Sequence, residues 1–145
     1  MIRAIAPERT WVLRRDTLNP GKPLPTELDP RVTVRGACHL GWFDGERLLG
    51  VGTIGRHPLP LEPAAIAWFV RGMSVAEFHR SRGIGSEILK ALIDHAAGCD
   101  PGGIAWCHAR LPAESFYSRH GFRLLDRVDL PDKGPRLRMA RPLVL

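Results

Sequence analysis

A short basic segment between two regular elements carries residue types that bind phosphate. It comprises Arg80, Ser81, Arg82, Gly83, Ile84, Gly85 and Ser86, and it leads into a strongly periodic helical stretch. The first N–H groups of a helix have no partner within the helix, and the helix dipole adds partial positive charge there. Glycines remove side chains, so the backbone can approach a ligand closely. The segment predicts a pyrophosphate site, although a tight turn alone would also explain the two glycines.

The spacing of the glycines excludes two common phosphate-binding motifs. A Walker loop requires a lysine directly after its last glycine, and Ser86 follows Gly85. A dinucleotide fingerprint requires a third glycine three residues after the second, and Ile88 stands there. The segment therefore predicts a phosphate site of a different kind.

A second informative segment, residues 113–122, contains the chain's only tyrosine. We expect a short helix there, closed by Gly121 and followed by a strand. Phe116 and Phe122 are typical of core packing. Tyr117, taken alone, is typical of a half-buried aromatic residue whose hydroxyl finds a partner.

The elements that must position these segments follow from turn residues and periodicity. Apolar residues recur every three or four positions from Ile84, and this pattern predicts a helix that ends at Gly98. Asp44-Gly45 between two apolar runs predicts a hairpin. A strand, helix and strand within 64–110 require a right-handed crossover and a parallel pair. The predicted strands are 2–5, 37–43, 47–54, 64–75, 103–110, 122–130 and 135–143; the helices are 7–18, 84–97 and 112–120; and proline-rich loops cover 19–36 and 57–63.

Size and composition indicate an ordinary globular chain. Its 145 residues predict a single domain spanning 1–145, with 44% hydrophobic and 25% charged residues. No apolar run approaches the roughly 18 residues of a membrane span, and the start lacks a signal-peptide pattern. We therefore expect a cytoplasmic protein with no membrane partner. Cys38, Cys99 and Cys107 are scattered, as expected for reduced thiols.

The net charge of +6 comes mainly from eighteen arginines against three lysines. Such a charge favours anionic partners, among them nucleic acid, anionic lipid or a polyphosphate ligand. The arginines are dispersed through the chain, so no nucleic-acid-binding tail is indicated. We expect no nucleic-acid partner and no metal.

The two segments together resemble the GNAT family of N-acetyltransferases. Arg80-x-x-Gly83-x-Gly85 is similar to that family's coenzyme A loop, and Gly72-Met73-Ser74-Val75 is similar to the strand that precedes it. The run from Ala113 to Phe122 resembles the family's later A-x-x-[FL]-Y-x-x-x-G-F element. All three lie in the family's order, so the resemblance covers most of the chain.

The resemblance implies an α/β (α+β) fold with acetyl-CoA as acyl donor. The sheet would be mixed and mostly antiparallel, flanked by helices, with a parallel central pair, 64–75 and 103–110, splayed into a V. The pantetheine arm would lie in that opening and pair with backbone groups of Met73 and Val75, beside a bulge that Gly72 permits. The implied cofactor-binding residues are Met73, Ser74, Val75, Arg80, Ser81, Arg82, Gly83, Ile84, Gly85, Ser86, Arg110 and Phe116.

The implied reaction is direct attack of a primary amine on the thioester in a ternary complex. A backbone N–H near Met73 would stabilise the oxyanion, and Tyr117 would be the catalytic proton donor to the coenzyme A thiolate. His108, Glu62, His79 and a water relay remain candidates for the base. The acceptor, a small molecule or peptide, is not named by the sequence. The alternative is a non-catalytic acyl-CoA-binding module or sensor, and a homodimer is compatible with either function.

Two departures from the family pattern concern the substrates. Arg110 stands where members often carry an asparagine that contacts the coenzyme. The proline-rich residues 19–36 occupy the place of the family's second helix, a region that usually shapes the acceptor pocket.

Overall fold

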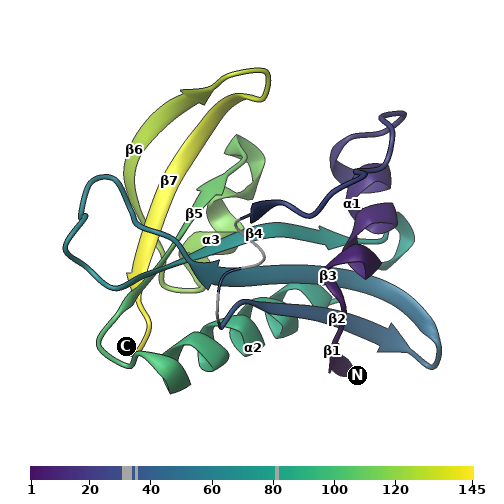
Figure 1. Ribbon diagram of the computed structural model, residues 1–145, viewed down its shortest axis with the longest axis horizontal. Coiled ribbons are helices and arrows are strands. Elements are labelled where there is room, and N and C mark those ends of the chain that lie inside the picture. Colours follow the sequence, from purple (N-terminus) through teal and green to yellow (C-terminus); the bar gives the residue numbers. More distant parts are fainter. Residues whose placement is uncertain (31–33, 35, 81) are drawn as a thin grey trace.

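The protein is described by a computed structural model that covers residues 1–30, 34, 36–80 and 82–145. Seven strands form one sheet in the order β1-β2-β3-β4-β5-β7-β6 (Figure 1). Only β4, Ala67–Val75, and β5, Ile104–Ala109, pair in parallel. The other strands are β1 Ile2–Ala4, β2 Cys38–Asp44, β3 Arg47–Arg56, β6 Arg123–Leu130 and β7 Gly134–Pro142. This arrangement confirms the predicted mixed, mostly antiparallel sheet with a parallel central pair.

The helices lie on both faces of the sheet. Helix α1, Trp11–Leu18, follows a 3-10 turn at Pro7–Thr10 and packs against β3 and β4. Helix α2, Ile84–Cys99, crosses β2, β3 and β4 on the other face (Figure 1). Helix α3, Glu114–Arg119, follows a 3-10 turn at Leu111–Ala113. Two further structures that the sequence predicts, the Asp44-Gly45 hairpin and the helix before Asn19, are confirmed.

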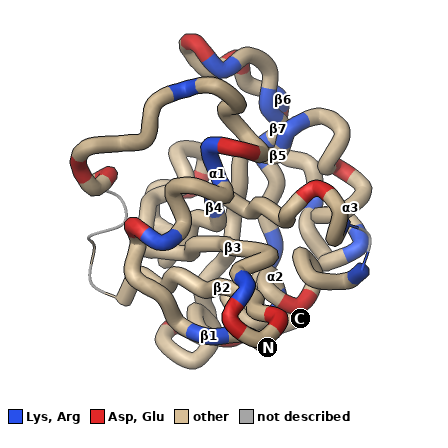
Figure 2. The backbone as a smooth tube through the Cα atoms, turned by 90° about the vertical axis from the view of Figure 1, so that its right-hand side faces the viewer, with Lys and Arg blue, Asp and Glu red and all other residues tan. Residues whose placement is uncertain are grey.

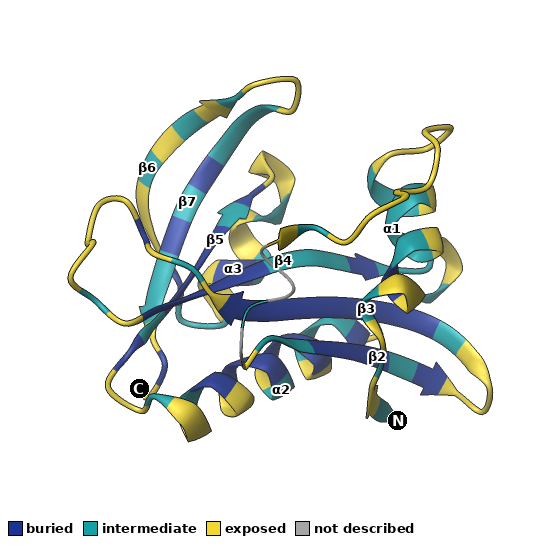
Figure 3. Ribbon diagram, viewed as in Figure 1, coloured by how far each residue is buried: buried dark blue, intermediate teal, exposed yellow. Residues whose placement is uncertain are grey.

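The main core lies between the sheet and α2. Ile88, Leu89 and Leu92 of α2 are fully buried against Trp68 and Val70 of β4, and Tyr117 and Phe122 extend the same cluster. Figure 3 shows the buried faces of β3, β4 and α2 and the largely exposed loop after α1. The rigid part of the molecule is therefore the α2 side, where the predicted helix periodicity is satisfied.

A bulge interrupts β4 at Gly72, which has φ +61°. Val51 pairs with Ser74 and Thr53 with Arg71, so Gly72 and Met73 together oppose the single residue Gly52. Glycine suits this position because L side chains rarely adopt a positive φ. The bulge implied at Gly72 is confirmed.

Two predicted boundaries are wrong. Helix α2 does not end at Gly98, because it continues to Cys99 and the Asp100 N–H still bonds to the Ala96 carbonyl at 2.8 Å. Pro101 ends the helix instead, since the residue before proline avoids helical angles and Asp100 has φ −139°. Strand β4 begins at Ala67 and not at residue 64. Its parallel pairing with β5 also begins there, since Ala67 pairs with Ile104.

Charge is distributed along the whole chain, as the dispersed arginines predict (Figure 2). No helix among the described residues combines the length and apolarity that crossing a bilayer requires.

Candidate active site

Strands β4 and β5 separate beyond Val70 and Cys107, the last pair in their parallel register. β4 continues to Val75 and stays paired with β3, whereas β5 ends at Ala109. The β4 residues 71–75 therefore present one backbone edge that no strand covers. An extended ligand could pair with this edge as an added strand would.

The uncovered edge leads to the N-terminus of α2. Gly83 is the N-cap residue with φ +82°, and no side chain caps the helix. The first N–H that bonds within the helix belongs to Glu87, which donates to the Gly83 carbonyl at 3.0 Å. The N–H groups of Ile84, Gly85 and Ser86 donate to no other described residue. These amides are in the arrangement that binds anions at helix N-termini.

Basic side chains flank these amides. Arg80 Nε donates to the Val75 carbonyl at 3.3 Å, and Arg82 lies 2.7 Å from His79 Nδ1. All three side chains are largely exposed or half-buried, so they remain hydrated and mobile partners for phosphate. Ser81, predicted with this group, lies outside the described residues.

Tyr117 and Phe116 connect the phosphate-binding end to the strands. The Phe116 ring lies beside Gly85, 3.5 Å from the position of an added Cβ, and contacts Tyr117 edge-on with 5.1 Å between centroids. Tyr117 is 7% exposed, and its hydroxyl forms no hydrogen bond within the described chain. Burial raises the pKa of Tyr117 well above its ordinary value, so the phenol stays protonated.

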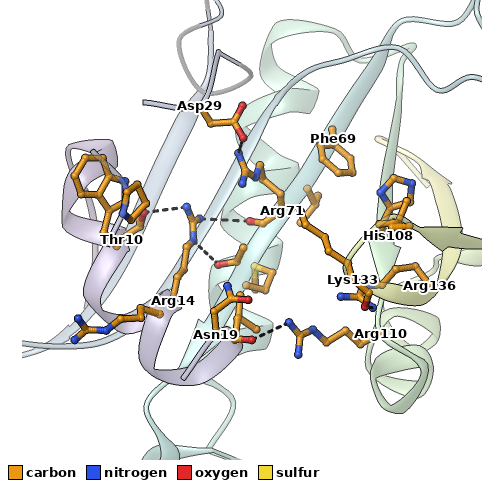
Figure 4. A pocket seen from close by; sticks show the side chains of 18 of the residues that line it. Thr10, Arg14, Asn19, Asp29, Phe69, Arg71, His108, Arg110, Lys133 and Arg136 are labelled. Atoms are coloured by element: carbon orange, nitrogen blue, oxygen red, sulfur yellow. Dashed lines mark hydrogen bonds and ion pairs between the residues drawn. The ribbon is translucent and has the colours of Figure 1, made fainter. Parts of the chain in front are cut away.

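A cavity of about 1210 Å³ opens on the face opposite α2. Its floor is the diverging part of β4 and β5, including Met73, His108 and Ala109. Tyr117 also lines it, so the predicted catalytic residue faces this space. One wall is α1 with residues 19–30, and the other is the turn between β6 and β7 (Figure 4). None of the described residues 80 and 82–86 lines the cavity, so among the described residues the two candidate binding regions approach each other near Met73 and Tyr117.

Arg14 of α1 binds the bulge from within the cavity wall, a role that sequence reasoning missed. Its guanidinium donates to the Gly72 carbonyl at 2.9 Å and to the hydroxyls of Thr53 at 2.6 Å and Thr10 at 2.9 Å (Figure 4). Burial, and then the charge of Arg71, lower the pKa of Arg14 to about 9, so the group is still charged at neutral pH. A Cβ at Gly72 would lie 2.2 Å from Arg14 Nε. Glycine and arginine therefore fix the bulge together.

Aromatic rings form the cavity floor around His108. The His108 ring lies edge-on to Phe69 at 5.5 Å and to Trp106 at 5.1 Å between centroids. Trp106, in turn, donates its indole N–H to the His57 carbonyl at 2.9 Å. Of the three residues predicted as candidate bases, only His108 lines the cavity; Glu62 is an exposed loop residue and His79 lies beside Arg82.

The predicted cofactor residue Arg110 lines this cavity. It follows β5 and donates to the Leu18 carbonyl of α1 at 3.2 Å (Figure 4). Ser74 is buried, and its hydroxyl is without a hydrogen-bond partner among the described residues. Ser74 pairs with Val51, so its backbone N–H and carbonyl face β3 rather than the uncovered edge.

The proline-rich segment after α1 covers part of the cavity, as the resemblance implies for this region. Asp29 forms an ion pair with Arg71 of β4 at 2.8 Å, which ties the segment to the strand. No group of three histidine, cysteine or acidic side chains in the described part of the chain is arranged to hold a metal ion.

Comparison with known proteins agrees with this geometry. The model of the "Acetyltransferase (GNAT) family" matches residues 8–122. The uncharacterized N-acetyltransferase YjcF of Bacillus subtilis (strain 168) is 30% identical over 111 residues, which are 71% of this chain and 69% of that protein.

Solved structures share the fold over nearly the whole chain. FeeM, an N-acyl amino acid synthase from uncultured soil microbes, superposes with a TM-score of 0.78 at 16% identity, covering 99% of this chain and 95% of that one. An aminoglycoside 6'-N-acetyltransferase complexed with coenzyme A superposes with a TM-score of 0.72 at 14% identity, covering 100% of this chain and 98% of that one. The matched family model and the shared fold establish that this chain is an acyltransferase of the GNAT acetyltransferase family.

Proposed function

We propose that the chain, as one domain spanning 1–145, transfers an acetyl group from acetyl-CoA to a primary amine by direct attack in a ternary complex. The observation that supports this proposal best is that three structural features lie next to one another. The parallel pair opens beyond Val70 and Cys107, the uncapped amides of α2 lie at one end of the opening, and Tyr117 lines the cavity at the other.

In this proposal the donor occupies the α2 side of the junction. The diphosphate accepts hydrogen bonds from the amides of residues 84–86, with Arg80 and Arg82 beside it. The pantetheine arm pairs with the uncovered backbone groups of Met73 and Val75, and Phe116 packs beside it. The thioester then lies at the bulge, where neither Gly72 nor Met73 has a ladder partner on β3.

The acceptor amine enters from the cavity and must first lose a proton. His108 is the titratable candidate on the cavity floor, directly or through water. The neutral amine adds to the thioester carbonyl, and a backbone N–H near Met73 stabilises the oxyanion. Collapse of the intermediate breaks the C–S bond. Tyr117, held protonated by burial, donates its proton to the departing thiolate, and the second proton of the attacking nitrogen, released as the amide forms, restores the phenol through water.

The Tyr117→Phe variant tests this assignment, because it removes only the hydroxyl of a buried ring. We expect kcat to fall about 10²-fold, the lower end of the usual contribution of an acid catalyst, with coenzyme A affinity unchanged. Thiol release from acetyl-CoA in the presence of an amine panel gives kcat, and calorimetric titration gives affinity. Unchanged turnover would remove Tyr117 from the mechanism, and a wild-type protein that binds acetyl-CoA without amine-dependent thiol release would instead be a binding module.

A further inference from the structure

The cavity wall carries an excess of positive charge. Among the residues that the structure describes, seven arginine or lysine residues line it against three acidic residues: Arg14, Arg15, Lys22, Arg71, Arg110, Lys133 and Arg136 against Glu27, Asp29 and Asp132. An amine acceptor is itself cationic before it reacts, so such a wall would repel an acceptor that carried positive charge alone. The excess of positive charge on the cavity wall therefore suits an acceptor that also carries a negatively charged group.

Two arginines contribute to this excess from neighbouring positions on one side of the cavity (Figure 4). Arg110 donates to the Leu18 carbonyl, and Arg136 of β7 donates to the carbonyls of Lys133 and Pro135 at 2.8 and 2.9 Å. Neither guanidinium contacts a carboxylate anywhere in residues 1–30, 34, 36–80 and 82–145.

Neighbouring arginines are balanced by contrast. Arg138 lies two residues after Arg136, on the same face of β7. Two nitrogens of its guanidinium group donate hydrogen bonds to the Asp126 carboxylate. Arg71 pairs with Asp29 across the cavity mouth. Arg71 and Arg138 thus have carboxylate partners, and Arg14 is held by hydroxyl and carbonyl oxygens at the bulge. Among the described residues, Arg110 and Arg136 donate to backbone carbonyls alone.

Arg110 and Arg136 also lie close enough to affect each other. Burial, and after it the charge of Arg110, lower the pKa of Arg136. Figure 4 shows both side chains on the β5 and β7 side of the cavity, near Lys133 and below His108, across from Arg14. An anion held between two guanidinium groups would relieve their repulsion, and the planar fork fits carboxylate, sulfonate or phosphate oxygens.

This pair lies outside the region proposed for the donor's diphosphate. The described residues 80 and 82–86 do not line the cavity, whereas Arg110 and Arg136 share it with His108 and Tyr117. An acid group on the pair would place the rest of a small acceptor against the floor where β4 and β5 diverge, close to the proposed thioester position.

We propose that the acceptor is a small amine that carries an acid group, and that Arg110 and Arg136 bind this group while the amine faces the β4 bulge. This inference rests on the proposed acetyl transfer. It assigns amino acids, aminosulfonates and phosphate-bearing amines to the substrate class and excludes polycationic amines. Arg110 accordingly serves the acceptor rather than the coenzyme.

Matched acceptor pairs test the proposal through the rate of thiol release from acetyl-CoA. One arm compares a set of amino acids with their amides, and a second compares phosphoethanolamine with ethanolamine. We expect kcat/KM to be at least about tenfold higher for the acid-bearing member of at least one arm, since a charge-assisted hydrogen bond contributes about 1.5–3 kcal/mol. The arm that responds distinguishes carboxylate from phosphate.

The variants R110Q and R136Q test whether these two arginines cause the preference for acid-bearing acceptors. R136K retains the positive charge but lacks the planar guanidinium group. Each Gln variant is expected to lower kcat/KM for the acid-bearing acceptor about tenfold through KM, while the neutral member changes less than about twofold. Coenzyme A affinity by calorimetry should stay unchanged. R127Q is the matched control, because Arg127 is exposed and lies opposite Leu137, on the other face of the hairpin from Arg136.

Three results would overturn the inference: equal rates for acid-bearing and neutral members in the wild type, equal losses for both members in the variants, or a parallel loss of coenzyme A affinity in R110Q. If R136Q does not fold, as judged by its thermal unfolding, R110Q and R136K decide the matter. Absence of thiol release with every amine would refute acetyl transfer itself, and the acceptor assignment with it.

Discussion

The two halves of the candidate site are built from different parts of the chain. On the proposed donor side, backbone groups would do the binding: the open edge of β4 and the amides at the start of α2. On the acceptor side, side chains from α1, β5, β7 and two loops meet across the cavity. Backbone geometry suits a ligand common to many enzymes, whereas side chains can change without altering the fold. The comparison therefore predicts that substitutions on the two sides have separable effects.

The largest expected effect is at the bulge where the two halves meet. Gly72→Ala places a Cβ 2.2 Å from Arg14 Nε and also requires a positive φ. We expect the free energy of unfolding to fall by about 3 kcal/mol or more, the combined cost of strain and overpacking. Urea denaturation measures it, and the folded fraction should also lose most of its acetyl transfer.

Gly45→Ala is the matched control for that substitution. Gly45 has a similar φ of +59°, but nothing lies within 4 Å of an added Cβ, so only the strain of about 1 kcal/mol should remain. In an Arg14→Ala background every atom that clashes is removed, and Gly72→Ala should then cost about as much as Gly45→Ala. Equal costs for Gly72 and Gly45 in the wild-type background would show that Arg14 does not fix the bulge.

A second, smaller effect should be confined to the donor side. Gly83→Ala adds a Cβ in front of the α2 amides, at φ +82° and with no protein atom within 4 Å. We expect coenzyme A affinity to fall about tenfold, because the added group obstructs hydrogen bonds to a charged ligand, while the KM for the acceptor stays the same. Gly134→Ala, at φ +84° with equal space, should lose similar stability but no affinity. An equal affinity loss in both variants would contradict a phosphate site at Gly83.

The smallest effect concerns Cys107, which lies behind the point where β4 and β5 diverge. Burial raises the pKa of its thiol from the ordinary 9.0 to about 12, although a hydrogen bond with the Met139 backbone opposes the rise. Between pH 9 and about pH 12, the Cys107 thiol is deprotonated in the unfolded chain but still protonated in the native state. The stabilisation is thus complete below pH 9 and is lost as the pH rises toward 12.

Urea denaturation at pH 8 and pH 10 checks this dependence. The wild type should lose about 1 kcal/mol of stability from this group over that interval, and Cys107→Ala should lose correspondingly less. Cys99→Ala, at an exposed position, should behave as the wild type does. An unchanged pH dependence in Cys107→Ala would assign the alkaline loss to other groups.

The backbone features of the proposed donor side could be predicted from the sequence because their signals are local. Gly83 and Gly85 stand next to the helix that they serve, and Asp44-Gly45 specifies its hairpin within two residues. Gly98 misled the prediction of the α2 end, since an exposed glycine is tolerated in a helix and Pro101 supplies the stop. These features depend on backbone conformation that neighbouring residues determine.

The acceptor side could not be predicted because its contacts are long-range. Arg14 reaches Gly72 over 58 positions, and Arg110 reaches Leu18 over 92. Nothing in the helical pattern of residues 11–18 distinguishes Arg14 from Arg15, yet one is buried at the bulge and the other pairs with Asp16 at the surface. Arg136 likewise gave no signal before β7 was placed beside β5. Only the assembled sheet shows which charges meet.

A crystal structure with bound coenzyme A tests the division between the two halves most directly. The account predicts diphosphate oxygens within hydrogen-bonding distance of the N–H groups of Ile84, Gly85 and Ser86, and pantetheine along the β4 edge from residue 71 to 75. It also predicts that Arg110 and Arg136 remain clear of the nucleotide. A diphosphate held by Arg110 and Arg136, with the α2 amides bonded to protein groups, would contradict it.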